Sequence, residues 1–136
     1  MARAIVITSG KGGVGKTSTA INIGIALNAL KKDVLIVDAN LTTPNVGLYL
    51  GAPIVPVSLN HVLAGKASID DVIYEHESGT KVIPSSISIK EIYNIKYDKL
   101  PNVIKKLKRF ADYIIVDSAA GLGEDSKYLI DAADEI

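Results

Sequence analysis

The stretch at residues 10–17 (GKGGVGKT) restricts what this chain can fold into more than any other feature of its sequence. It fits the pattern G-x-x-x-x-G-K-[ST], in which backbone N–H groups and one lysine surround an anion. Its glycines allow the backbone angles that turn successive N–H groups inward. The pattern requires a strand before it and a helix after it, and the flanking residues predict both. The stretch therefore predicts a phosphate-binding loop at the end of a buried strand.

Four short apolar runs predict the strands of a sheet. Each is rich in β-branched residues and is followed by a loop or a turn. The second run is continuously apolar up to its last residue, which is typical of a parallel strand that is covered on both faces. The four runs are residues 3–8 (RAIVIT), 33–38 (DVLIVD), 81–84 (KVIP) and 112–117 (DYIIVD).

Helices are predicted between these strands from the spacing of apolar residues and from capping residues. In residues 17–31, the predicted apolar face consists of Ala20, Ile23, Leu27 and Leu30. Further helices are predicted at residues 58–64, with Ser58 as the cap, and at residues 69–74, 101–111 and 124–134.

The alternation of strands and helices predicts an α/β fold, a parallel sheet with flanking helices, in one domain over residues 1–136. Ligands bind such sheets at the carboxyl ends of the strands, so the loops after residues 8, 38 and 117 are expected to meet at one edge. Ile136 resembles the first residue of another strand, and four strands leave an edge open. We therefore expect the N-terminal portion of a larger domain, or an edge covered by another chain.

The composition excludes several classes of protein. The 136 residues include 15 Lys+Arg and 15 Asp+Glu, and this balance argues against a dedicated nucleic-acid surface, although it permits a local basic patch. The absence of cysteine from these residues excludes disulfides, thiolate metal sites and a cysteine nucleophile among them. No apolar run approaches the roughly 20 residues of a membrane span, and none resembles a signal peptide. A cytoplasmic protein is therefore expected.

The residue types of the loop indicate its chemistry. Lys16 is expected to reach the β- and γ-phosphates of a nucleotide, and the Thr17 hydroxyl is expected to bind Mg²⁺. The dipole of the helix that starts near Thr17 adds positive potential. Lys11 is a second lysine in a loop that needs only one. The predicted nucleotide-binding residues of the loop are Gly10, Lys11, Gly12, Gly13, Val14, Gly15, Lys16, Thr17 and Ser18.

Two aspartates end apolar strands at the same edge of the predicted sheet. Asp38 and Asp117 are predicted to surround Mg²⁺ together with Thr17, at least one of them through water. The alternative is that each aspartate caps the turn that follows its strand. The N–H of Gly121, in the small-residue loop after Asp117, is predicted to face the γ-phosphate, with a flexible turn as the alternative.

Other polar residues are weaker candidates for a site. His61 and His76 lie far apart, and Tyr93 and Tyr97 are expected to pack or face solvent rather than stack on bases. Four basic residues are interpreted as the solvated face of the helix at residues 101–111, with a nucleic-acid or partner role as the alternative. They are Lys105, Lys106, Lys108 and Arg109.

Three motifs together resemble the deviant Walker A ATPases of the MinD/ParA family, and their order and spacing are most similar to archaeal MinD-like proteins. They are KGGVGKT with its additional lysine, VDANLTTPN and VDSAAG. The resemblance implies a P-loop NTPase fold, binding of Mg-ATP, and a nucleotide-sandwich dimer in which Lys11 reaches the partner's phosphates. It also implies that Asp38 and Asn45 belong to the first switch segment and that Asp117 is the Walker B-like aspartate.

The sequence departs from the family pattern in three places. Position 40, often a second aspartate associated with hydrolysis, is Asn40, and residues 117–121 read DSAAG without the family's proline. The chain also ends before the base-recognition segment and the membrane helix of the family, on which adenine specificity and membrane binding depend. We therefore expect slow hydrolysis, with Lys11, Lys16, Asp38 and Asn40 as the catalytic residues.

The resemblance implies a slow molecular switch that forms a homodimer around ATP and acts in division-site or other spatial positioning. Its implied partners are a protein that stimulates hydrolysis and, in the complete protein, the inner face of the cell membrane. Three alternatives remain open. A ParA-like partition ATPase would bind DNA in a salt-dependent manner. An iron–sulfur assembly or nitrogenase-reductase relative would need cysteines, and a nucleotide-binding scaffold would hydrolyse nothing.

Overall fold

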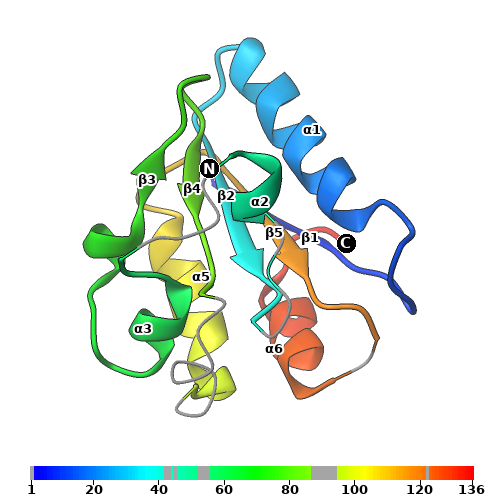
Figure 1. Cartoon of the computed structure of the whole chain (residues 1–136), viewed down its shortest axis with the longest axis vertical. Helices are drawn as coiled ribbons and strands as arrows, with labels where there is room; N and C mark the ends of the chain where they lie inside the picture. Colours follow the sequence, from blue (N-terminus) through cyan, green and yellow to red (C-terminus); the bar gives the residue numbers. More distant parts are fainter. Residues whose placement is uncertain (1, 42–43, 45, 52–55, 87–94, 122) are drawn as a thin grey trace.

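A five-stranded sheet forms the centre of the computed structural model, which describes residues 2–41, 44, 46–51, 56–86, 95–121 and 123–136. Four of its strands are parallel and confirm the four predicted strands. The strands are β1 (Arg3–Ile7), β2 (Val34–Ala39), β3 (Tyr74–Glu75), β4 (Lys81–Ile83) and β5 (Tyr113–Ser118). Their order across the sheet is β1-β5-β2-β4-β3 (Figure 1).

The edge strand β3 was not predicted from the sequence. The helix expected at residues 69–74 is instead a short 3-10 helix, η1 (Ile69–Val72), and the chain then enters β3. β3 pairs antiparallel with β4, with Tyr74 opposite Val82, and the Tyr74 hydroxyl donates to the carbonyl of Val57 at 2.9 Å. The prediction was wrong at this end because pairing with later residues, rather than local spacing, decided the conformation.

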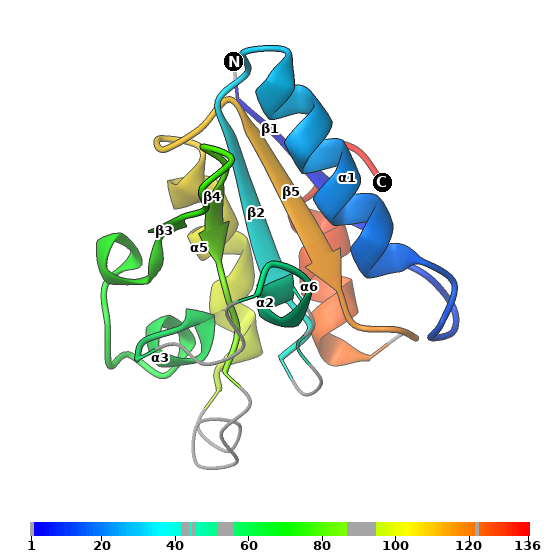
Figure 2. The same ribbon diagram turned by 45° about the horizontal axis from the view of Figure 1, so that its top comes forward.

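Helices cover both faces of the sheet. α1 (Lys16–Ala29) lies on one face, and α5 (Leu100–Leu107) and α6 (Glu124–Ala132) lie on the other (Figures 1 and 2). Val34 and Ile36 of β2 pack on the side of α1, whereas Leu35 and Val37 pack in the core on the opposite side. The continuous apolarity of this strand therefore reflects burial on both faces, as predicted.

The buried face of α1 differs from the predicted one. Ala20 is buried as expected, but Ile23 is 37% exposed and Leu30 is 70% exposed. The face that packs on the sheet instead includes Ile21 and Gly24. The prediction was wrong because apolar residues occur on several faces of α1, so their spacing did not select one.

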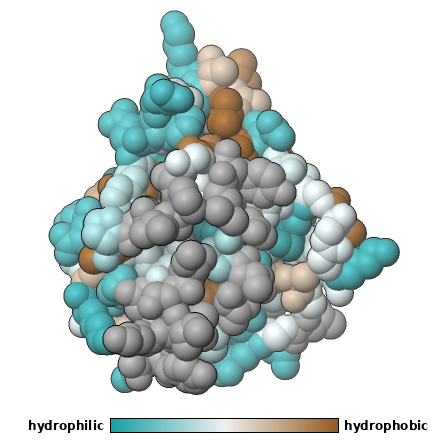
Figure 3. Space-filling model, viewed as in Figure 1, coloured by the Kyte–Doolittle hydropathy of each residue, from teal (hydrophilic) through white to brown (hydrophobic). Residues whose placement is uncertain are grey.

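Hydrophilic residues dominate the described surface in Figure 3, and hydrophobic residues lie among them in small groups.

Gly24 is where α1 comes closest to the sheet. A Cβ built on Gly24 would lie 2.6 Å from Cδ1 and 2.7 Å from Cγ1 of the buried Ile36. We expect Gly24→Val to lower the free energy of unfolding by about 1–3 kcal/mol, because added volume in a packed core forces neighbouring groups to move. Urea unfolding measures this change. The control is Ala26→Val on the exposed side of α1, with an expected loss of about 0.5 kcal/mol. A Gly24→Val protein as stable as the control would contradict the close packing.

Short helices connect the remaining elements. They include α2 (Val46–Tyr49), α3 (Leu59–Leu63) and the 3-10 helix η2 (Tyr97–Lys99). Ser58 caps α3 as predicted, and its N–H donates to Nδ1 of His61 at 3.0 Å, so His61 helps to form the cap. Within the described residues, no helix has the length and apolarity to cross a membrane.

The residues just before Ile136 lie beside β1. Glu135 forms a parallel bridge with Ile5, and the N–H of Ala4 donates to the Asp134 carboxylate at 2.7 Å. The Lys108 ammonium also pairs with this carboxylate at 2.7 Å. The hydrogen bonds from Lys108 and Ala4 hold the pKa of Asp134 below its usual value. The parallel bridge between Ile5 and Glu135 is the backbone pairing that a strand beginning near Ile136 would need.

Candidate phosphate-binding site

The loop at residues 10–15 joins β1 to α1 at the carboxyl edge of the sheet (Figure 2). Gly13 and Gly15 have positive φ angles of 72° and 90°, which residues with a side chain rarely adopt. A Cβ on either glycine would have no neighbour within 4 Å, so the backbone angles and not crowding require glycine here. The space over the loop is open, as a bound anion needs.

The N-terminus of α1 points its free N–H groups toward this loop. Gly15 precedes the helix, no side-chain hydrogen bond caps it, and its first turn has no acidic residue. The first N–H groups of a helix have no partner within the helix and attract anions. The hydroxyl of Thr19 bonds back to the Gly15 carbonyl at 2.7 Å, which holds the junction of loop and helix. The first turn is therefore a ready anion site.

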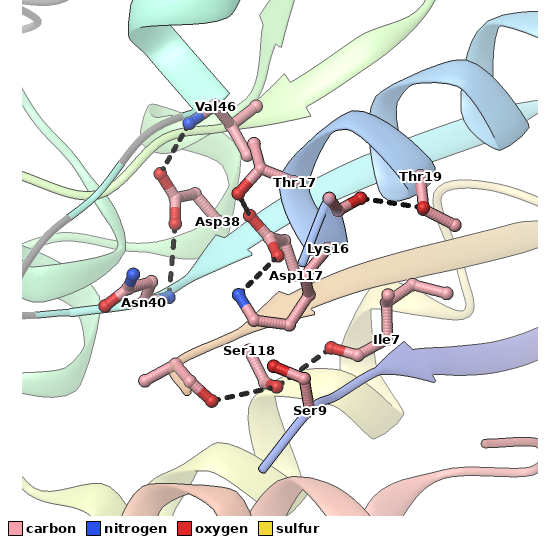
Figure 4. Close-up of polar contacts among 12 residues, drawn as sticks. Ile7, Ser9, Lys16, Thr17, Thr19, Asp38, Asn40, Val46, Asp117 and Ser118 are labelled. Carbon is pink, nitrogen blue, oxygen red and sulfur yellow. Dashed lines mark hydrogen bonds and ion pairs between the residues drawn. The ribbon is translucent and has the colours of Figure 1, made fainter. Parts of the chain in front are cut away.

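Asp117 connects this turn to the sheet (Figure 4). Its side chain is fully buried, and it accepts hydrogen bonds from Lys16 Nζ at 3.2 Å and from Thr17 Oγ1 at 2.7 Å. The Thr17 proton is directed at the carboxylate, so the lone pairs of the hydroxyl oxygen remain available to a cation. The structure thus brings the predicted site residue Asp117 to Lys16 and Thr17, which lie 101 and 100 positions earlier in the sequence.

Asp38 lies opposite Asp117 in the register of β2 and β5. Ile36 and Ile115 lie two positions before these aspartates and pack on the α1 side of the sheet. The alternation along the strands therefore places both carboxylates on the side of α1. Both residues are completely buried, and the Lys16 ammonium pairs with Asp117 at 3.2 Å. Two neighbouring buried carboxylates favour a further cation, and their oxygens are the ligands that Mg²⁺ prefers.

Asp38 also organises the loop that follows β2. Its Oδ1 accepts the N–H of Asn40, and its Oδ2 accepts the N–H of Val46, both at 3.1 Å (Figure 4). The capping role that the sequence allowed as an alternative is therefore present in this structure. Asn40 is 6% exposed, at the carboxyl end of β2. Asn45, predicted to belong to the same segment, lies outside the described residues.

The loop after Asp117 is attached to β1 and to the phosphate-binding loop. The Ser118 hydroxyl donates to the carbonyl of Ile7 at 2.8 Å, and the N–H of Gly121 donates to the carbonyl of Ser9 at 2.9 Å. In this structure the Gly121 N–H, predicted to face a phosphate, is thus bonded to the chain itself. Ser9, Ser118 and Ser85, whose hydroxyl donates to the Asp38 carbonyl, were not predicted as site residues. The short hydroxyl side chain at strand ends is the only sequence signal they carry.

Other candidates stay apart from this site. Lys11 is exposed and makes no ion pair with any described residue. His76 lies in the turn after β3, where its Nδ1 contacts the Ser78 hydroxyl at 2.9 Å. Within the described residues, no three His, Cys, Asp or Glu side chains are grouped to hold a metal ion. A cation at this site would therefore rest on Thr17, Asp38 and Asp117.

Comparison with known proteins extends over almost the whole chain. A family model described as an AAA domain matches residues 2–136. An uncharacterized ATP-binding protein of Methanocaldococcus jannaschii is 42% identical over 134 residues, which cover 98% of this chain and 51% of that protein. The septum site-determining protein MinD of Synechocystis is 37% identical over 90% of this chain and 47% of its own length.

A solved structure supports the same relationship. The septum site-determining protein MinD of Pyrococcus horikoshii, complexed with Mg-ADP, matches with a TM-score of 0.93 and 37% identity. The match covers 98% of this chain and 56% of that chain. The chain thus spans about half the length of the relatives that it matches.

Proposed function

Because this chain belongs to the MinD/ParA family of P-loop ATPases, we propose that it binds Mg-ATP, dimerises around it and hydrolyses it slowly as a molecular switch. One arrangement carries this proposal: Lys16, Thr17 and the buried Asp117 meet at an uncapped helix N-terminus beneath a glycine loop. A site for phosphate alone would need the loop and the lysine, but not two buried carboxylates beside a hydroxyl. Their presence favours a nucleotide that carries a metal ion.

The residues of the site fit Mg²⁺. Thr17 offers a hydroxyl oxygen whose proton is held by Asp117, and Asp38 lies beside Asp117 on the neighbouring strand. When bound, Mg²⁺ would neutralise charge on the β- and γ-phosphate oxygens. The Asp38 oxygens already accept two backbone N–H groups, which favours contact between Asp38 and the ion through water.

The protein's own groups position the phosphates. The N–H groups of the glycine loop and of the first turn of α1 surround the anion, and Lys16 adds a charge that is largely shielded from solvent. Lys16 pairs with Asp117 in this structure, so its ammonium is already held at the base of the loop. Phosphoryl transfer depends mainly on such positioning and charge stabilisation.

Hydrogen bonds connect the site to two neighbouring loops. Asp38 holds the N–H groups of Asn40 and Val46 in the first loop. Ser118 and Gly121 attach the second loop to the residues that enter the phosphate-binding loop. If Gly121 is to donate to a γ-phosphate, its bond to Ser9 has to break. We propose that this exchange lets the second loop respond to the state of the nucleotide.

Asn40 sets the expected rate of hydrolysis. An asparagine can orient a water molecule but cannot accept its proton, whereas an aspartate can do both. We therefore expect Asn40→Asp to raise the turnover of ATP by about tenfold or more, within the range of general-base catalysis. Steady-state phosphate release by the intact protein measures this rate. Asn28→Asp, near the distal end of α1, is the control and should leave turnover unchanged. A flat or lower rate in Asn40→Asp would show that Asn40 does not face the attacking water.

The experiment that tests the proposed function follows ATP turnover and binding together. We expect the intact protein to bind ATP in the presence of Mg²⁺ and to release phosphate slowly, with both activities lost in excess EDTA. Tight binding without phosphate release would identify a scaffold instead. Retention on DNA that requires ATP and falls steeply with salt would identify a partition ATPase.

The similarity to septum site-determining proteins supports a further part of this proposal, which is that the switch acts in positioning the division site or another structure in the cell. We propose that a second protein stimulates hydrolysis and that the switch acts in the cytoplasm, at the inner face of the cell membrane. Vesicle sedimentation of the intact protein with ATP or ADP tests the location. Equal sedimentation with both nucleotides would contradict a membrane switch.

A further inference from the structure

A groove of about 550 Å³ lies between α5 and the segment that contains α3 and η1. None of the residues that line it belongs to the phosphate-binding site. Its floor is apolar and continuous with the main core, against which most of the floor residues pack while staying partly exposed. The floor consists of Val62, Ala67, Ile69, Val103 and Phe110.

Three cationic side chains line the same groove: Lys99, Lys106 and Arg109. Their positions are seven and three residues apart, so they follow one side of α5 and of the turns at its two ends. If this stretch were helical throughout, the three would span about 15 Å, close to three helical turns. The groove is therefore an apolar channel with a basic border.

These three cations have no ion-pair partner within the described part of the chain. None forms an ion pair with another described residue, whereas the neighbouring Lys108 pairs with Asp134 at 2.7 Å. Asp70 is the one carboxylate among the described residues that line the groove, and together with the three cations it gives these residues a formal charge of +2 in a chain whose net charge is zero. Lys108 is thus used internally, whereas Lys99, Lys106 and Arg109 face the groove.

We propose that this groove is a docking site for an acidic, amphipathic segment of a partner protein. The apolar side chains of that segment enter the floor, and its carboxylates pair with Lys99, Lys106 and Arg109. The combination of charge and recessed apolar surface is what favours a protein segment. A layer of lipid headgroups would pair with the cations but would not contact the recessed floor. The described lining of the groove offers the bases of a nucleic acid one aromatic ring for stacking, that of Phe110.

The probe for this proposal is a fluorescein-labelled, 14-residue peptide of glutamate and leucine at helical spacing, added to the intact protein. A peptide in which serine replaces leucine keeps the charge and removes the apolar side chains. We expect the glutamate–leucine peptide to bind at least roughly tenfold more tightly by fluorescence anisotropy, because burial of even a few leucines has that effect. Equal binding of the two peptides would overturn the proposal, as would no binding of either.

Variants of the protein test whether this binding occurs in the groove. Lys106→Glu/Arg109→Glu should weaken binding of the glutamate–leucine peptide by roughly tenfold or more, since two attractive charges become repulsive. Lys105→Glu/Lys127→Glu is the matched control, because it changes the net charge equally at two exposed lysines outside the groove, and it should change binding by no more than roughly twofold. Ala67→Gln fills the floor without changing charge and should also weaken binding. ATP turnover should be the same in all of these variants. Equal losses in the two double variants would reveal general electrostatic attraction and overturn the proposal.

Other occupants would give different results. Phosphatidylserine vesicles and a single-stranded oligonucleotide also carry anionic groups that pair with cations, so both are measured with the same variants. Binding of either that needs Lys106 and Arg109, without peptide binding, would overturn the proposal in favour of a membrane or nucleic acid. Self-association of the wild-type protein that is lost in the double variant would assign the groove to a second copy and overturn it as well.

Discussion

Lys16→Ala is expected to weaken binding of Mg-ATP by about two orders of magnitude or more. The side chain supplies the charge that faces the β- and γ-phosphates, in a site otherwise built largely of neutral N–H groups. Each hydrogen bond from a charged group contributes about 1.5–3 kcal/mol, so losing two of them has an effect of this size. Isothermal calorimetry on the intact protein measures the change.

The buried ion pair requires a second variant at this position. Lys16→Ala leaves the completely buried Asp117 without its lysine, and breaking a buried pair is itself destabilising. Lys16→Gln keeps an N–H donor for Asp117 and removes only the positive charge. We expect it to remain folded by circular dichroism and still to lose ATP binding. Unchanged ATP affinity in a folded Lys16→Gln protein would contradict the assignment of the loop.

Lys11→Ala is expected to lower ATP turnover by about 10³–10⁵-fold while the monomer still binds ATP. The size of the effect is that of an arginine finger supplied by a second subunit. Lys16 already provides the charge on the bound phosphates of its own chain. A second ammonium about 4 Å from it would repel it by about 1–4 kcal/mol, depending on screening. Lys11 is exposed, and its side chain is therefore accessible to a second subunit.

Two measurements test this action in trans. Turnover per chain should rise with protein concentration in the wild type, and sedimentation should show ATP-dependent dimers that Lys11→Ala lacks. Lys32→Ala, an exposed lysine beyond the end of α1, is the control and should dimerise and hydrolyse normally. Wild-type turnover that is independent of concentration would refute the assignment, as would a Lys11→Ala protein with normal dimers and normal turnover.

Features that depend on adjacent residues were predictable from the sequence. The glycine loop, the strand before it and the helix after it were predicted because one short stretch determines their backbone angles. The cap of α3 by Ser58 was predicted for the same reason. The continuous apolarity of β2 correctly indicated a parallel strand that is covered on both faces. In each case the physical cause lies within a few residues of its effect.

The site itself was only partly predictable. The residue types of Lys16, Thr17 and Asp117 and the rule for the carboxyl edge placed them in one site before their contacts were known. The N–H groups that the loop after β2 donates to Asp38 were expected only as an alternative to metal binding. The hydrogen bond from the Ser118 hydroxyl to the Ile7 carbonyl was not foreseen. It joins two strands that are distant in sequence, so no local pattern marks it.

The sequence by itself determined the phosphate-binding loop, the class of fold and the family, because these depend on contiguous motifs and on their order along the chain. Only the tertiary structure decided which face of α1 packs on the sheet. Gly24 is buried there because Ile36 of β2 leaves no room for a larger side chain, whereas Ile23 remains exposed. The basic groove beside α5 likewise results from contacts between segments that are distant in sequence. Packing between distant segments selects among local patterns that are individually compatible with several structures.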